Sequence, residues 1–253
     1  TLIDDIAMLN AALKIVDQNP LGSAAGYGSS FPIDRTFTTK ELGFETLKYN
    51  SVAAQMSRGK SEKTVAFAMS SVAATLAKFS MDVCLYMSQN FDFITLPSHL
   101  TTGSSIMPHK KNPDVFELIR GKCNKIQALP YEITLITNNL PSGYHRDLQL
   151  LKEGLFPAIQ NLKACLDIAL FSIKDIKVKE HILDDKKYDY LFTVDSLNEM
   201  VVAGMPFRDA YKAVAEQLEN GTFQSPKETK HTHEGSINNL CLDAIKEKMR
   251  VAF

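Results

Sequence analysis

The stretch that decides the fold is SEKTVAFAMSSVAATLAKFSMDVCLYMS, which spans residues 61–88. Its apolar side chains recur in alternating steps of four and three, at Val65, Met69, Val72, Leu76, Phe79, Val83 and Tyr86. This spacing predicts a helix with a heptad-like seam, and no Gly or Pro interrupts it. At 1.5 Å per residue, such a helix is about 40 Å long. Phe67 and Leu85 add apolar surface off the seam, which favours a helix covered on several faces, in a bundle or at a subunit interface.

Two further apolar stripes agree with a helical bundle. One runs from Ile3 to Val16 and should end at Asn19-Pro20, because a proline disfavours helix in the residue before it. The other runs from Leu148 to Leu170 and contains Pro157, an expected kink. Period-two alternation is scarce, and only residues 91–96 are compatible with a short strand. We therefore expect an all-α fold with a long-helix bundle.

Another helix is expected to begin at Asn112-Pro113. Asparagine is a favoured N-cap residue, and proline is tolerated in the first turn of a helix. Pro130 should break or bend this helix.

The pattern changes to charged, irregular sequence near residues 171–185. Shorter helices are expected beyond it, at residues 190–203, 207–218 and 238–249. We divide the chain into a central helical-bundle domain at residues 1–177 and a small C-terminal helical domain at residues 178–253.

Composition excludes several classes of protein. The 253 residues hold 28 Lys+Arg and 29 Asp+Glu, a net charge of −1, and 45% are hydrophobic. This balance excludes a disordered chain and a polybasic nucleic-acid binder. We find no signal-like segment after Thr1 and no apolar stretch approaching the roughly 20 residues of a membrane span. The four cysteines are far apart in sequence, which favours a reducing cytoplasm over a disulfide framework or a metal cluster.

The most informative polar stretch is GSSIMPHKKNPD, residues 103–114. A glycine and two serines form a loop, two lysines follow, and a helix N-terminus comes directly after them. Free N–H groups and the helix dipole there favour an anionic ligand. A capping turn with solvated lysines explains the same composition.

This loop resembles the signature of the fumarase/aspartase superfamily, and its flanks resemble argininosuccinate lyases. The flanking stretches are Asn112-Pro113-Asp114, ELIRGK at residues 117–122, PLGS at 20–23, FPIDR at 31–35 and LPSGYHRDLQLLKE at 140–153. The resemblance extends from Pro20 to Ser236. The family usually has Gln at His109 and Asn-Lys at His145-Arg146, and these departures leave the chemistry-bearing residues intact.

The resemblance implies cleavage of argininosuccinate into arginine and fumarate without a metal or organic cofactor. Removal of a proton beside a carboxylate requires a base and preorganised positive donors. By resemblance Ser104 is the base, Lys110 stabilises its alkoxide, and Glu117 pairs with a catalytic histidine. The competing interpretations are a turn hydroxyl for Ser104, a solvated Lys110, and an ordinary helical pair between Glu117 and Arg120.

Four further residues match substrate-binding positions of the family: Asn112, Tyr144, Gln149 and Lys152. Asn112 can instead cap the helix. Gln149 and Lys152 would share one helix face if Asp147 caps that helix, and a solvent-exposed face is the alternative. Ser23 and Arg35 receive no role. The pair His231-x-His233 has no third ligand nearby, so we expect no metal site.

The histidine that pairs with Glu117 belongs, in the family, to a Thr-x-His stretch without a counterpart here. We therefore expect a C-terminal portion of a longer enzyme, inactive alone. The resemblance also implies a homotetramer whose active sites each draw on three subunits, acting on a small molecule in the cytoplasm. Two rivals remain: another superfamily lyase, such as adenylosuccinate lyase, or a non-catalytic homologue like the related lens crystallins.

Overall fold

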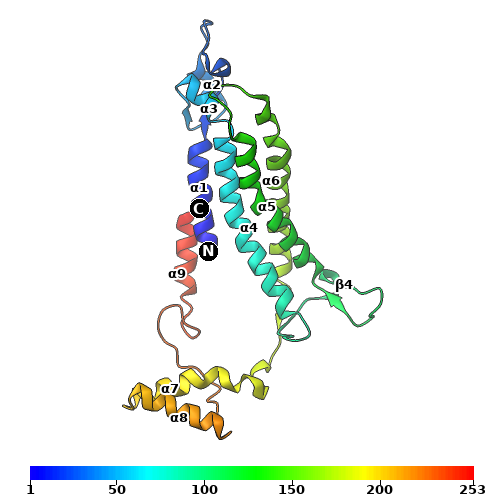
Figure 1. Ribbon diagram of the computed structural model, residues 1–253, viewed down its shortest axis with the longest axis vertical. Helices are drawn as coiled ribbons and strands as arrows, with labels where there is room; N and C mark the ends of the chain where they lie inside the picture. The colour runs from blue at the N-terminus through cyan, green and yellow to red at the C-terminus, as the bar shows by residue number, and fades with distance from the viewer. The chain divides into compact units, whose positions relative to one another are not determined.

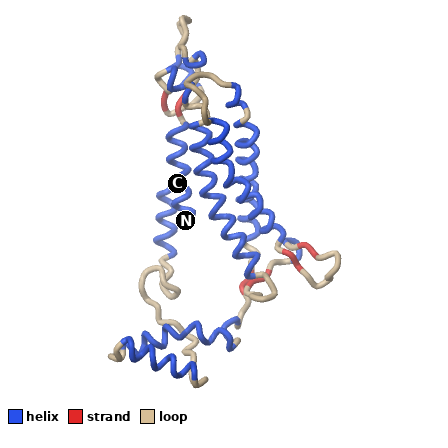
Figure 2. The backbone as a smooth tube through the Cα atoms, viewed as in Figure 1, coloured by secondary structure: helices blue, strands red, loops and turns tan.

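The computed structural model describes all 253 residues, and the chain is mainly helical (Figures 1 and 2). It forms two compact units, Thr1–Lys177 with Ala252–Phe253, and Val178–Val251. The α-helices of the first unit are α1 (Leu2–Val16), α2 (Arg35–Glu41), α3 (Ser51–Met56), α4 (Lys60–Tyr86), α5 (Asp114–Thr137) and α6 (Leu151–Ile173). Its short 3₁₀ helices are η1 (Ala24–Gly26), η2 (Ser98–Leu100) and η3 (Arg146–Gln149). The expected all-α bundle is confirmed.

The bundle core lies between α4, α5 and α6, which run side by side in Figure 1. The predicted seam of α4 faces this core: Met69, Val72, Leu76 and Val83 are buried, and Val65 and Phe79 pack against them. Facing residues of α5 are Phe116, Ile119, Cys123, Ile126, Leu129 and Ile133, and those of α6 are Leu151, Leu155, Ala158, Leu162, Cys165 and Ala169. Burial of these side chains supplies the main driving force for the bundle.

The expected Asn112 cap of α5 is wrong, and of the break or bend expected at Pro130 the break does not occur. The helix begins at Asp114 with Pro113 as the residue before it, and Asn112 belongs to a short strand instead of capping the helix. Pro130 does not break the helix, which continues to Thr137. Pro130 is itself buried in the bundle, so packing offsets the hydrogen bond that proline cannot donate. Pro157 likewise lies inside α6, which continues to Ile173.

Strands are limited to two-residue segments. β1 (Gln18–Asn19) pairs in parallel with β2 (Thr46–Leu47), and β4 (Thr102–Gly103) pairs antiparallel with β5 (Lys111–Asn112). β3 (Ile94–Thr95) lies within the expected strand at residues 91–96, and β6 is Lys177–Val178. The β4–β5 pair holds the two ends of the 104–110 loop together.

The second unit has its own small core. After the 3₁₀ segments η4 (Ile182–Asp184) and η5 (Lys186–Phe192) come α7 (Thr193–Val202), α8 (Phe207–Glu219) and α9 (Leu242–Ala252). Leu197, Ala210 and Val214 are buried between α7 and α8. The last helix begins four residues later than the sequence predicts, because residues 235–239 form hydrogen-bonded turns instead.

Length and composition alone would allow two helical segments, Lys60–Tyr86 and Arg146–Ile173, to cross a membrane. The sequence argument against a span therefore does not hold on that criterion. The same criterion is met by core helices of soluble proteins, and the apolar faces of α4 and α6 both contribute to the bundle core.

Candidate functional site

The loop at residues 104–110 leaves and re-enters the bundle through the β4–β5 pair, with Thr102 opposite Asn112 and Gly103 opposite Lys111. Ser104 stands at the first position after β4 and is half-buried. Its Oγ accepts hydrogen bonds from the backbone N–H groups of Ile106, at 3.2 Å, and Met107, at 3.0 Å. The turn-hydroxyl interpretation of Ser104 therefore describes the geometry, and the same two donors would stabilise negative charge on Oγ.

A cavity of about 650 Å³ lies between this loop, the C-terminal end of α4 and the start of α5. Its lining residues are Cys84, Met87, Ser88, Gln89, Asp92, Ile94, Thr95, Leu96, Met107, His109, Lys110, Lys111, Asn112, Pro113 and Glu117. The cavity thus brings together three of the sequence-predicted site residues: Lys110, Asn112 and Glu117. Ser104 is not among its lining residues.

Side chains of both charge signs line the cavity. Lys110 and Lys111 stand at the loop exit beside the N-terminus of α5, and Lys111 Nζ donates to Ser98 Oγ at 3.2 Å. Asp92 and Glu117 supply carboxylates. The lysines and the helix dipole favour an anion, and the carboxylates can accept hydrogen bonds from a cationic group.

Glu117 is exposed toward the cavity, one turn into α5. In the competing interpretation Glu117 pairs with Arg120, but Arg120 Nη1 contacts Met81 Sδ at 3.0 Å. Cys84 also lines the cavity, and burial raises the pKa of its thiol despite the nearby Arg120 charge. A thiol in this state is a weak nucleophile.

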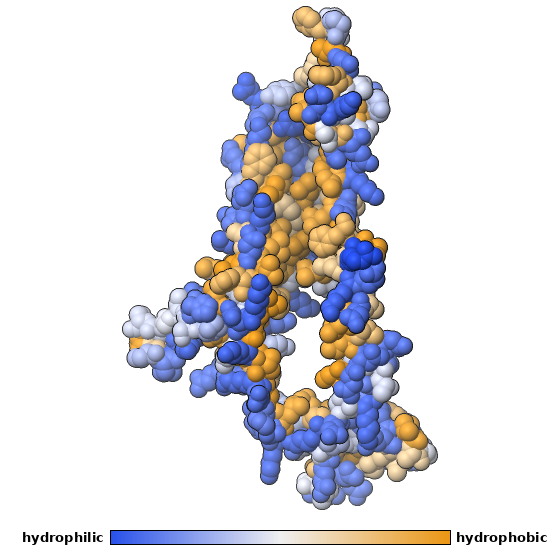
Figure 3. Space-filling model, turned by 180° about the vertical axis from the view of Figure 1, so that it is seen from behind, coloured by the Kyte–Doolittle hydropathy of each residue, from blue (hydrophilic) through white to orange (hydrophobic).

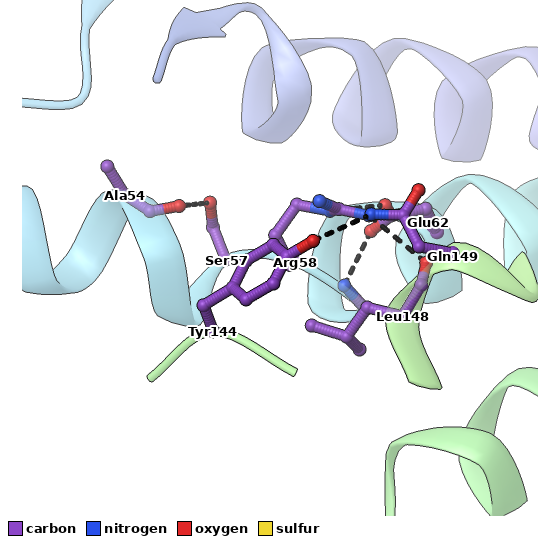
Figure 4. Close-up of polar contacts among 8 residues, drawn as sticks. Ala54, Ser57, Arg58, Glu62, Tyr144, Leu148 and Gln149 are labelled. Carbon is purple, nitrogen blue, oxygen red and sulfur yellow. Dashed lines mark hydrogen bonds and ion pairs between the residues drawn. The ribbon is translucent and has the colours of Figure 1, made fainter. Parts of the chain in front are cut away.

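Tyr144, Gln149 and Lys152 form a separate group beyond the C-terminal end of α5, and Figure 4 draws Tyr144 and Gln149. Gln149 Nε2 donates to Tyr144 Oη at 3.4 Å, and Lys152 follows in the first turn of α6. Gln149 lies in η3, and α6 begins at Leu151. The condition for Gln149 and Lys152 to share one helix face, a single helix capped by Asp147, is therefore not met.

The length of α5 separates the two groups. Its 24 residues span about 36 Å between the loop cavity and the turn that leads to Tyr144. One small substrate cannot touch both groups of a single chain.

A contact missed by the sequence analysis lies next to the second group. Arg58 Nη2 donates to the backbone oxygen of Leu148 at 3.1 Å, and its Nε contacts Glu62 Oε1 at 3.4 Å (Figure 4). Glu62 Oε2 in turn accepts from the backbone N–H of Gly59 at 2.6 Å. A glutamate three residues after a helix start is the one signal in the sequence that points to this turn.

Arg35 has a structural role that the sequence left open. Its guanidinium donates to the backbone oxygens of Leu21 at 2.7 Å, Lys48 at 2.7 Å and Tyr49 at 2.9 Å, which ties the segment around residue 21 to the loop before α3. In the second unit, His231 Nε2 contacts Asp195 Oδ1 at 2.8 Å. No group of three or more His, Cys, Asp or Glu side chains gathers in the arrangement of a metal site.

Comparison with known proteins identifies the family of this chain. The family model described as "Lyase" matches residues 1–128. Curated proteins named argininosuccinate lyase from Parabacteroides distasonis and Phocaeicola vulgatus are 60% and 58% identical to this chain over 250 residues, and one from Xanthomonas campestris pv. campestris is 38% identical over 249 residues. The matches cover 97–99% of this chain and 56–58% of those relatives, so the chain spans little more than half of their length.

Solved structures agree on the fold. An EDDS lyase in complex with formate superposes with a TM-score of 0.75 at 17% identity, covering 99% of this chain and 57% of that chain. A fumarate lyase:delta crystallin from Brucella melitensis bound to cobalt gives a TM-score of 0.69 at 19% identity, covering 99% and 55%. At these identities the likeness establishes the helical architecture alone.

Proposed function

Because this chain belongs to the lyase family, whose model matches residues 1–128, we propose that it forms part of an argininosuccinate lyase that releases arginine and fumarate. The observation that carries the proposal is the cavity beneath the 104–110 loop, which gathers Lys110, Asn112 and Glu117 at the N-terminus of α5. Relatives at 57–60% identity bear the name of this enzyme, which favours argininosuccinate over adenylosuccinate as substrate.

Ser104 is the proposed base. Its alkoxide would take the proton from the carbon beside a substrate carboxylate; the C–H electron pair becomes the double bond of fumarate, and the C–N pair leaves with the guanidino nitrogen. An unassisted serine is far too weak for this step. The N–H groups of Ile106 and Met107 already point at Oγ, and Lys110 would add positive charge when the loop closes over substrate.

The proposed roles of the other cavity residues follow from their charge. Lys110, Asn112 and the α5 N-terminus suit a substrate carboxylate. Glu117 would hold and raise the basicity of the family's catalytic histidine, for which these 253 residues contain no counterpart. For that reason we expect the chain alone to be inactive.

Tyr144, Gln149 and Lys152 are proposed to bind substrate in a site completed by other copies of the chain, since α5 separates them from the cavity. We propose a homotetramer in which opposite ends of neighbouring bundles meet. Apolar surface along the bundle, which Figure 3 shows in orange, supports association. Phe67, Leu118, Tyr131 and Leu170 are each more than half exposed. Light scattering should give an oligomer, and a 28.2 kDa monomer would contradict this part of the proposal.

We propose a cytoplasmic location, supported by four cysteines that are all free thiols. A substrate of this size and the reaction itself require no organic cofactor, since the base and the charge-stabilising donors are side chains and backbone groups.

The test uses a chimaera in which this chain replaces the matching 250 residues of the Parabacteroides distasonis relative. We expect the chimaera to release arginine and fumarate from argininosuccinate, and the 253-residue chain alone to release neither. AMP release from adenylosuccinate would favour the first rival. A folded chimaera without turnover on either substrate would favour a non-catalytic homologue, and appreciable fumarate from the chain alone would refute the expected inactivity.

A further inference from the structure

The turn before α4 is bound to the segment that precedes the second group of site residues. Arg58 reaches from this turn to the backbone oxygen of Leu148, 90 residues later in the chain. Figure 4 draws Arg58 with both of its partners, Glu62 and Leu148. Both partners are at least half shielded from solvent, because the Arg58 and Glu62 side chains are 30% and 21% exposed.

We propose that Arg58 is a positioning residue for substrate binding by Gln149 and Tyr144, an inference that rests on the proposed lyase function. The carbonyl that Arg58 binds belongs to the peptide group joining Leu148 to Gln149. Fixing the orientation of that peptide group fixes where the Gln149 side chain leaves the backbone. Gln149 in turn donates to Tyr144 Oη, so the same contact sets the geometry of both side chains.

Two contacts fix Leu148, one through its side chain and one through its carbonyl, so the peptide group between the core and Gln149 has a defined orientation. Its side chain is 5% exposed and belongs to the bundle core, and its carbonyl is bound by Arg58. Arg58 and Leu148 also line a cavity of about 140 Å³, together with Pro141, Ser142 and Gly143. The hydrogen bond from Arg58 connects the Leu148 backbone to the turn before α4.

This arrangement requires an arginine because the side chain must donate to two acceptors in different directions, the Glu62 carboxylate and the Leu148 carbonyl. Nη2 faces the carbonyl and Nε faces Glu62, and the planar guanidinium holds both donors in a fixed geometry. A lysine keeps the charge but presents a single ammonium, so Arg58→Lys separates geometry from charge. Arg146→Lys is the matched control, because Arg146 lies in the 3₁₀ segment that contains Leu148 and is exposed.

Hydrogen exchange on the 253-residue chain tests the contact without reference to function. Leu148 and Leu150 donate backbone hydrogen bonds to His145 and Asp147. We expect Arg58→Lys to speed exchange of these two amides by about tenfold, as expected for loss of a charge-assisted hydrogen bond, and Arg146→Lys to leave it unchanged. Equal exchange in Arg58→Lys and the wild type would overturn the inference.

Kinetics in the chimaera test the consequence for the site. Loss of binding groups that act equally in ground and transition states raises KM and spares kcat. We expect Arg58→Lys to raise KM for argininosuccinate by about tenfold with kcat within about threefold, and Arg146→Lys to change neither. A fall in kcat at unchanged KM, or a lower thermal midpoint with unchanged KM, would refute the positioning role. A chimaera that never cleaves argininosuccinate would refute the proposed function, while the exchange experiment still decides whether Arg58 orders residues 148–150.

Discussion

Replacing Gly59 by alanine tests how tightly the turn before α4 fits against the end of α5. Gly59 has φ +81°, and a Cβ there would clash with Thr137 Cγ2. The left-handed backbone costs an L-residue about 1–2 kcal/mol. Forcing a methyl group into a filled site costs about 1–3 kcal/mol more. We expect Gly59→Ala to lower the free energy of unfolding by about 2–5 kcal/mol in total.

The matched control is Gly43→Ala. Gly43 has a similar φ, +73°, but nothing lies within 4 Å of its built Cβ. It should therefore pay the backbone cost of about 1–2 kcal/mol and no more. The difference between the two variants, measured by urea unfolding of the 253-residue chain, isolates the steric contact with Thr137.

A second-site change tests the identity of that contact. Thr137→Ser removes Cγ2 and keeps the hydroxyl that donates to Ile133 O at 2.8 Å. The double variant Gly59→Ala/Thr137→Ser should lose about as much free energy of unfolding as Gly43→Ala does. A double-mutant cycle measures this coupling between residues 59 and 137 directly. Equal losses for the two glycine variants, or no rescue by Thr137→Ser, would show that the turn is not packed as described.

Three further predictions concern the core and its titrating groups. Phe116 is fully buried and meets the Phe79 ring edge-on at 5.9 Å, so Phe116→Ala should cost about 3–5 kcal/mol in urea unfolding, and a cost below 1 kcal/mol would contradict that burial. Burial raises the pKa of the Cys123 thiol from 9.0 to about 12. Because the folded state favours the neutral thiol, this group stabilises the fold fully below pH 9, and the stabilisation is lost as pH rises from 9 toward 12. Alkylation at pH 8 should label Cys241 and leave Cys123 unmodified in the folded chain. Asp5 is buried and accepts hydrogen bonds from two hydroxyl groups of α4, at 2.5 and 2.7 Å, so Asp5→Ala should lower the thermal midpoint through a loss of about 1–3 kcal/mol, and an unchanged midpoint would refute the role of that contact.

The helices could be predicted where apolar periodicity is strong. The seam of residues 61–88 gives α4, observed at Lys60–Tyr86, because burial of that face outweighs every local preference. Prediction failed at Asn112 and Pro130, where local rules were overridden from outside the helix. Pairing with Thr102 holds Asn112 in a strand, and the bundle accepts Pro130 as a buried residue.

The site could be predicted in composition but not in arrangement. The 103–114 stretch points to the loop with Lys110 and Asn112, and the resemblance of the 117–122 flank points to Glu117; the cavity brings these three residues together. Nothing in the sequence indicates that Tyr144 lies at the opposite end of α5, since that depends on the uninterrupted length of the helix. The role of Arg58 could not be predicted, because its partner is a backbone carbonyl 90 residues away. No side-chain motif in the sequence indicates such a contact.

The central claim is that the Ser104 hydroxyl removes the proton in the elimination. Its most direct test is the rate of fumarate formation by the chimaera carrying Ser104→Ala, followed by ultraviolet absorbance, with Ser105→Ala as the neighbouring-serine control. Loss of a general base should lower kcat by about 10²–10⁴-fold while KM stays near its original value, and the control should retain full turnover. Equal turnover by the Ser104→Ala chimaera and its parent would contradict the account.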